Sequence, residues 1–243
     1  VRYREVGNTL AERVVLFEGA LGASAHDGAR VRFGPDGKVY VTMGDVDDRS
    51  LPQDLAAFNG KILRLNEDGT TPADNPFASP VFSYGHRNPQ GLDWHPVSGD
   101  LWATEHGDVG NDELNVITRG GNYGWPVIEG SLTMPGMSTP IRSYSPSIAP
   151  SGAAFYTGAL FPTFRNNLFF ATLVGEHLHR LRLDPTDARR VLDGERLLDG
   201  WFGRLRDVVT GPDGAIYVTT SNRDGRGMPA TDDDRILRLV PAR

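Results

Sequence analysis

The chain has 243 residues, of which 39% are hydrophobic and 23% are charged, and its formal net charge at pH 7 is −6. This length and composition are typical of a globular protein that buries one large core or two small ones. The negative charge provides no basic surface for nucleic acid, no apolar run reaches the length of a membrane span, and the absence of cysteine excludes disulfides, thiolate metal sites and cysteine nucleophiles.

The first segment predicts two short strands, at residues 2–6 and 13–19, joined by a turn near Gly7 and Asn8. Charged residues occur throughout this stretch, so it does not resemble the apolar centre of a signal peptide. No long helix is predicted anywhere in the chain.

A hairpin is predicted at 30–42, where two apolar runs flank the turn Gly34–Gly37, of sequence GPDG. Proline presets φ at the second position of such a turn, and glycine supplies the positive φ that follows. Another alternating strand is expected at 60–66.

The hairpin pattern recurs along the chain. The turn GPDG at 211–214 repeats the turn at 34–37 with an offset of 177 residues, and weaker copies lie at 91–117 and 152–183. Three repeat steps in 177 residues give about 59 residues per unit, enough for three or four strands and a long loop. This self-similarity predicts an all-β fold, a β-propeller with one sheet per blade, and about four blades are visible. A β-sandwich also uses short strands but does not repeat itself in this way.

Polar residues gather between Tyr84 and Pro126, on loops at the ends of predicted strands. Such loops on a rigid scaffold often carry function, although a solvated connection has the same composition.

The motifs resemble one family. They are His26, Asp45, GHRNPQG at 85–91, EHG at 105–107 with DELN at 112–115, GGNYGWP at 120–126 and RLRD at 204–207. Together the chain resembles the soluble quinoprotein aldose dehydrogenases of the glucose/sorbosone dehydrogenase family, which are six-bladed propellers that use pyrroloquinoline quinone (PQQ) with calcium.

The resemblance implies that residues 1–243 form a single propeller domain, an incomplete C-terminal portion of a six-bladed ring. Family members carry roughly two further blades before the position of His26. We therefore expect an open, C-shaped array of sheets with one apolar sheet face exposed.

The resemblance implies that His26 is the general base and that Asp45 orients it. A lone histidine is more often structural, but a carboxylate at a predicted strand end favours the catalytic interpretation. Arg87 and Asn88 match residues that contact the quinone. Arg87 would stabilise the negative charge that appears on the quinone carbonyls as hydride arrives. The alternative is that Arg87 forms a surface salt bridge. His86 and His95 are predicted to be structural.

By the same resemblance, the main-chain carbonyls of Gly107 and Asp108 would hold calcium, although many members have proline at the position of Asp108. Arg204 and Arg206 match arginines that bind PQQ carboxylates, and their spacing places both on one face of a strand. Surface arginines would show the same spacing. Asp112 and Glu113 are expected to shape the calcium loop or to hold a second ion.

Two positions depart from the family pattern. Val174 stands where glucose-oxidising members have a lysine for PQQ, and Ser145 stands where they have a tryptophan beside the cofactor.

The implied activity is oxidation of an aldose at C1 to the lactone, with hydride transfer to PQQ and an external electron acceptor. The alternatives are a non-catalytic propeller that binds carbohydrate or protein, and a calcium-dependent hydrolase of the lactonase type. Relatives are periplasmic or secreted. The preferred sugar, the acceptor and the oligomeric state are not predicted.

Overall fold

The structure is a computed structural model that describes residues 1–242. In these residues the chain forms strands β1 to β17 and a single 3₁₀ turn at Pro162–Phe164, so the predicted all-β class is confirmed. No helix in this part of the chain is long and apolar enough to cross a membrane.

The strands form one hairpin and four antiparallel sheets, and in every sheet neighbours in sequence are neighbours in space. The hairpin is β1 (Arg2–Val6) and β2 (Thr9–Val14). The first sheet is β3 (Gly28–Phe33), β4 (Val39–Met43), β5 (Lys61–Leu65) and β6 (Val81–Tyr84). The second is β7 (Pro89–Trp94), β8 (Leu101–Glu105), β9 (Asp112–Ile117) and β10 (Arg142–Tyr144). The third is β11 (Pro150–Phe155), β12 (Leu168–Thr172), β13 (Leu178–Leu183) and β14 (Val191–Leu197), and the fourth is β15 (Leu205–Thr210), β16 (Ile216–Thr220) and β17 (Ile236–Leu239).

The second strand was predicted at 13–19 but begins at Thr9. Gly7 and Asn8 both have positive φ, which makes a tight two-residue turn, and Val6 then pairs with Thr9. The apolar run at 14–17 suggested a later strand, but the turn chemistry fixes the register.

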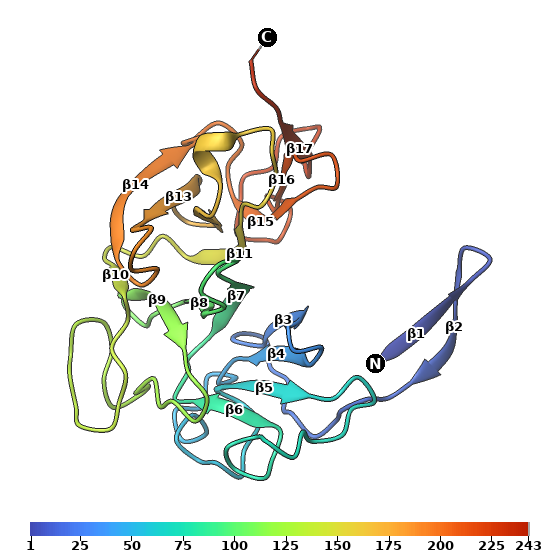
Figure 1. The fold of residues 1–243 in the computed structure, drawn as a ribbon, viewed down its shortest axis with the longest axis vertical. Coiled ribbons are helices and arrows are strands. Elements are labelled where there is room, and N and C mark those ends of the chain that lie inside the picture. Colours follow the sequence, from blue (N-terminus) through green and yellow to red (C-terminus); the bar gives the residue numbers. More distant parts are fainter. Residues whose placement is uncertain (243) are drawn as a thin grey trace.

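The sheets follow one another around an open arc, with the β1–β2 hairpin projecting from it (Figure 1). The first strands of successive sheets pack together, β3 on β7, β7 on β11 and β11 on β15. Within residues 1–242 no strand of the first sheet pairs with the last, and Val31 and Phe33 on β3 are 59% and 63% exposed. The expected open array is therefore observed; that it belongs to a six-bladed ring stays a prediction.

Three apolar clusters lie between adjacent sheets and hold the arc together. Ile62 and Leu92 belong to the cluster between the first and second sheets, and Trp102 and Phe170 to the one between the second and third. The third cluster, between the third and fourth sheets, includes residues such as Phe169 and Val208.

The repeated turn keeps the same contacts in both copies. Asp36 Oδ2 accepts hydrogen bonds from Tyr40 Oη at 3.1 Å and Arg64 Nε at 3.0 Å. Asp213 Oδ2 accepts from Tyr217 Oη at 3.1 Å and Arg238 Nε at 2.9 Å. The internal repeat is thus one of side-chain interactions as well as of strands.

Candidate active site

A cavity of ≈ 520 Å³ lies where the four inner strands begin. Because β3, β7, β11 and β15 pack side by side, the loops that precede them meet at one place. The lining is strongly polar: Ser24, Ala25, His26, Asp27, Arg87, Asn88, Gln90, His106, Gly107, Asp108, Asp112, Ser147, Ala149, Leu173, Val174, Arg204, Arg206, Asp224 and Arg226.

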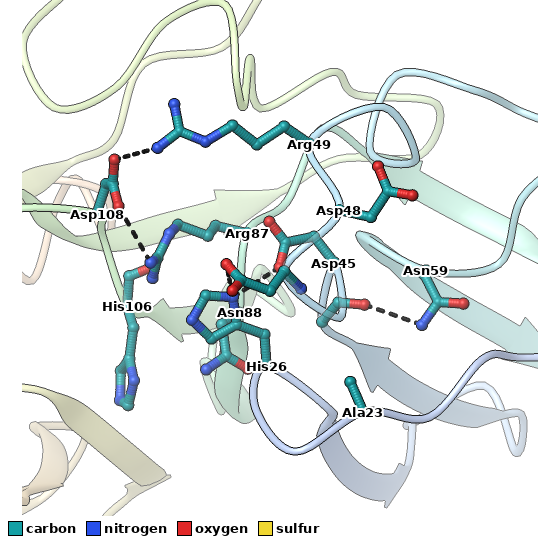
Figure 2. A network of polar contacts seen from close by, with 12 residues as sticks. Ala23, His26, Asp45, Asp48, Arg49, Asn59, Arg87, Asn88, His106 and Asp108 are labelled. Atoms are coloured by element: carbon teal, nitrogen blue, oxygen red, sulfur yellow. Dashed lines mark hydrogen bonds and ion pairs between the residues drawn. The ribbon is translucent and has the colours of Figure 1, made fainter.

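His26 lies against Asp45, which is almost completely buried (Figure 2). The Nδ1 of His26 is 2.8 Å from Asp45 Oδ1, and the other oxygen of Asp45 accepts a hydrogen bond from Trp125 Nε1 at 2.8 Å. The backbone N–H of Asp47 also donates to Asp45 Oδ1. Since an ionised carboxylate only accepts hydrogen bonds, the proton of a neutral His26 sits on Nδ1 and the lone pair on Nε2.

The backbone around His26 is tightly constrained. His26 has φ of 56°, a conformation that is uncommon for a residue with a side chain. A Cβ on Gly44 would lie 1.8 Å from the carbonyl oxygen of His26, so only glycine permits this approach. Gly44 follows β4, and the close packing brings the neighbouring Asp45 under the histidine.

Arg87 extends over the Trp125 ring, with its Cζ 5.3 Å from the ring centroid. Its guanidinium donates to Asp108 Oδ1 at 3.3 Å, and Figure 2 shows the two side chains meeting beside His106. The Nε of Arg87 is buried and has no hydrogen-bond partner within residues 1–242. An unpaired buried donor is costly, so the Nε of Arg87 leaves a hydrogen bond unmade beside the cavity.

Asn88 is buried beside Arg87. Its side-chain oxygen accepts a hydrogen bond from Gln90 Nε2 at 2.9 Å, and its backbone carbonyl accepts one from the N–H of His106. These two bonds fix the strand entry at the cavity wall.

Gly107 and Asp108 form a loop that is held from outside the cavity. The N–H of Gly107 donates to Asp112 Oδ1 at 3.0 Å, and the N–H of Asp108 donates to Glu129 Oε1 at 2.6 Å. In residues 1–242 neither carbonyl accepts a hydrogen bond, which leaves both oxygens available to a cation. The carboxylate of Asp108 is occupied by Arg49 and Arg87.

Asp112 connects this loop to the next sheet. Its second oxygen accepts bonds from Ser147 Oγ and from the N–H groups of Ile148 and Ala149, at 2.7 to 2.8 Å. Asp112 therefore shapes the loop, one of the two predicted roles. No group of three acidic or histidine side chains that could hold a metal occurs within residues 1–242, which gives no support to a second ion there.

Arg204 and Arg206 share one carboxylate. Asp224 Oδ2 accepts from Arg204 Nη2 at 2.9 Å and from Arg206 Nη2 at 3.1 Å. Burial opposes ionisation of Asp224, but the hydrogen bond from Arg204 and the charges of both arginines hold its pKa below the usual value. Burial in turn lowers the pKa of Arg206. Two cations facing one anion leave a net positive surface in the cavity.

His106 lines the cavity and is neutral at physiological pH. Burial, with further contributions from the charges of Arg87 and Arg206, lowers its pKa to about 4. Its Nε2 is buried without a partner within the described residues, as is the Nε of Arg87. Both unpaired atoms belong to residues that line the same cavity.

Glu113 lies behind the wall that carries Arg87. Burial and then the nearby charge of Glu105 raise the pKa of Glu113 to about 8, so it holds a proton at neutral pH. Glu105 itself accepts hydrogen bonds from the Arg87 N–H and from His86 Nδ1. Asn115 Nδ2 lies 3.0 Å from Glu113 Oε2, and Asn115 Oδ1 is buried without a partner in the described residues. If the oxygen and nitrogen of the Asn115 amide exchanged places, protonated Glu113 would donate a hydrogen bond to the oxygen.

The structure brings the predicted site residues together. His26, Arg87, Asn88, Gly107, Asp108, Arg204 and Arg206 line the cavity, and Asp45 supports His26 from behind. Val174 lines it too, whereas Ser145 does not and Ser147 does. The two histidines predicted to be structural are buried: His86 stacks on Tyr123 and bonds Ser83 and Glu105, and His95 packs on Phe155.

Sequence reasoning missed Trp125, His106 and Asp224. Trp125 lies in the GGNYGWP motif and His106 in the EHG motif, so both were close at hand in the sequence. Asp224 is in an unremarkable polar loop after β16, and only its contact with two arginines reveals it.

A sequence model of the Glucose / Sorbosone dehydrogenase family matches residues 1–237. An aldose sugar dehydrogenase from Escherichia coli is 34% identical over 84% of this chain and 60% of its own length. Quinoprotein glucose dehydrogenase B from Acinetobacter calcoaceticus is 28% identical over 98% of this chain and 67% of its own. The chain thus spans 60% of the length of the first of these relatives.

Among solved structures, the PQQ-bound form of an aldose sugar dehydrogenase from Streptomyces coelicolor superposes with a TM-score of 0.86 and 41% identity. The match covers 98% of this chain and 68% of that one. The match therefore includes all four sheets.

Proposed function

The chain belongs to the glucose/sorbosone dehydrogenase family, and from that premise we propose that it provides the cofactor and sugar site of a PQQ-dependent aldose dehydrogenase. The observation that carries the proposal is that His26, Arg87, Arg204 and Arg206 line one cavity, with Asp45 hydrogen-bonded to His26 from behind. A propeller that only binds a partner has no need of a base, its orienting acid and three arginines on one cavity.

The residues of the cavity fit a planar, polyanionic quinone. Arg87 Nε and His106 Nε2 are buried and unpaired, and the two arginines on Asp224 have donor capacity to spare. PQQ carries three carboxylates, which Arg204 and Arg206 would bind through charged hydrogen bonds. When bound, PQQ supplies the quinone that accepts the hydride from C1 of the sugar.

The protein's own residues handle the proton. His26 Nε2 would accept the proton of the C1 hydroxyl, while Asp45 holds Nδ1–H and stabilises the imidazolium that results. Three hydrogen bonds keep Asp45 in place, so the base is oriented before substrate arrives. Arg87 would stabilise the negative charge that a bound quinone gains as hydride leaves C1 of the sugar.

Calcium would bind the free carbonyls of Gly107 and Asp108. Oxygen ligands suit this ion, and the position of Asp108 needs only a carbonyl, which explains why aspartate can stand where many members have proline. The Asp108 side chain would keep its contacts with Arg49 and Arg87.

The product would be the lactone, and the electrons would pass to an external acceptor. Since the chain spans 60% of the length of the E. coli relative, activity of the whole protein is part of the proposal. We extend by analogy the periplasmic or secreted location of relatives to this protein.

The test is a titration with PQQ and calcium, followed by added glucose, with absorbance of the bound quinone as the readout. Saturable binding and sugar-dependent bleaching are expected, and His26→Asn should slow bleaching about 10²–10⁴-fold while sparing binding. Hydrolysis of a lactone without PQQ would favour the hydrolase instead. If neither this chain nor one extended to the length of its relatives binds PQQ, the proposal is wrong.

A further inference from the structure

A second cavity, of ≈ 370 Å³, lies at the outer edge of the arc between the second and third sheets. Its walls come from β10, which carries Arg142 and Tyr144, from His179 on β13, and from Gly194 and Arg196 on β14. Figure 1 shows β10 next to β14, away from the inner strands. The proposed PQQ site uses none of these residues.

The cavity carries unbalanced positive charge. Neither Arg142 nor Arg196 forms an ion pair or a side-chain hydrogen bond within residues 1–242. The acidic residues of β14 have other partners, since Asp193 pairs with Arg182 and Glu195 with Arg180. In a chain with net charge −6, two unpaired arginines at one cavity indicate a site for an anion.

His179, which lines this second cavity, has a tautomer that its neighbour His177 fixes. His177 Nδ1 lies 2.7 Å from the carbonyl of Gly175, which only accepts, so His177 must donate there. His177 Nε2 then accepts from His179 Nδ1, 3.0 Å away. A neutral His179 therefore presents the lone pair of Nε2, an acceptor.

Other features support this arrangement. Burial, His177 and then the charges of Arg142 and Arg196 lower the pKa of His179 to about 3, so it stays neutral. A Cβ on Gly194 would lie 3.2 Å from His179 Nε2, so the glycine leaves that nitrogen uncovered. The hydroxyl of Tyr144 is buried and unpaired.

We propose that this cavity binds a small oxyanion that also carries a hydroxyl group. The two guanidinium groups would bind the anionic oxygens, and His179 Nε2 would accept a hydrogen bond from the hydroxyl. Hydrogen phosphate and hydroxycarboxylates share this chemistry. A cation is excluded by the two arginines, and a simple carboxylate leaves His179 without a donor.

The test is isothermal titration of the purified chain with three probes, inorganic phosphate, gluconate and hexanoate. Saturable binding is expected for phosphate or gluconate, and the tighter of the two assigns the source of the oxyanion. Hexanoate has the carboxylate without hydroxyls and should bind at least tenfold more weakly. Equal binding of all three would overturn the proposal, as would the absence of saturable binding.

Variants locate the site. Arg142→Gln with Arg196→Gln should lower affinity at least tenfold, whereas the matched pair Arg2→Gln with Arg119→Gln, which removes the same charge from exposed positions outside the cavity, should not. His179→Phe keeps the ring on Phe170 and should remove the preference over hexanoate; His179→Gln serves if the first variant does not fold. Binding unchanged in the double variant would place the anion elsewhere, including the main cavity, and would overturn the proposal.

Discussion

The two walls of the main cavity differ in how completely their charged groups are paired. At the wall that carries His26, the carboxylate of Asp45, which follows β4, accepts hydrogen bonds from three donors, and one of these is His26. At the wall made by β15, one carboxylate, Asp224, is shared by two arginines that retain free donors. The first wall is complete without a ligand, as a base oriented in advance must be, whereas the second is completed only by an anion.

Removing the base tests the first wall and should have the largest effect. His26→Asn is expected to lower kcat of the PQQ-loaded protein about 10²–10⁴-fold, with little change in PQQ affinity. The matched control is Asp47→Asn. The exposed carboxylate of Asp47 lies 3.8 Å from Nδ1 of His26, and its removal should change kcat less than about twofold. Full activity of the His26 variant would remove the distinction between the walls.

Removing a cation tests the second wall. Arg204→Gln should weaken PQQ binding about 10–100-fold, since a buried hydrogen bond between charged groups contributes about 1.5–3 kcal/mol. Arg238→Gln is the control, because Arg238 also pairs with an aspartate but lies on β17, outside the cavity. Equal affinities in the two variants, measured by fluorescence titration, would show that the second wall does not bind the cofactor.

Glu113 lies behind the wall that carries Arg87, and its protonation state decides whether a second negative charge is buried beside Glu105. The folded protein keeps a proton on Glu113 up to about pH 8, whereas the unfolded chain releases it near 4.5. Between these values the folded state binds more protons, so stability must fall as pH rises, by a few kcal/mol at most.

Glu113→Gln imitates the protonated acid and should make unfolding by urea less dependent on pH, with its gain largest at about pH 9 and smallest at about pH 5. Exposed Glu67→Gln should leave the pH dependence of the parent unchanged. A parallel pH dependence in the Glu113 variant would mean that Glu113 is ionised in the folded protein.

The smallest effect concerns the link between the walls. Arg30 lies on β3, which begins just after His26, and Asp207 lies on β15 next to Arg206. Arg30 Nη1 is 2.7 Å from Asp207 Oδ2. They are 177 residues apart, the offset of the internal repeat, so equivalent positions of two blades form the pair. Since both are partly exposed, a double-mutant cycle with Arg30→Gln and Asp207→Asn should give a coupling of about 0.5–1 kcal/mol that falls with salt. No coupling would make the walls independent.

Much of the fold followed from local chemistry. The turn at 34–37 and its copy at 211–214 predicted two hairpins because proline and glycine act on the backbone within a few residues. The outer strands β10 and β14, which carry no apolar alternation, were not predicted, since they form by pairing with a neighbour already in place.

The sequence by itself determined the all-β class, the repeat and the residue types of the site, because turn propensity and motif order are local properties. Only the tertiary structure decided which side chains meet. Asp224 reaches Arg204, Trp125 reaches Asp45, and His179 faces Arg142 and Arg196. These residues lie 20, 80 and at least 17 positions apart. Asp224 and Arg204 lie on loops of the same sheet, and His179 is the cross-strand partner of Arg196, whereas Trp125 and Asp45 belong to two successive sheets. No local pattern specifies any of these pairings.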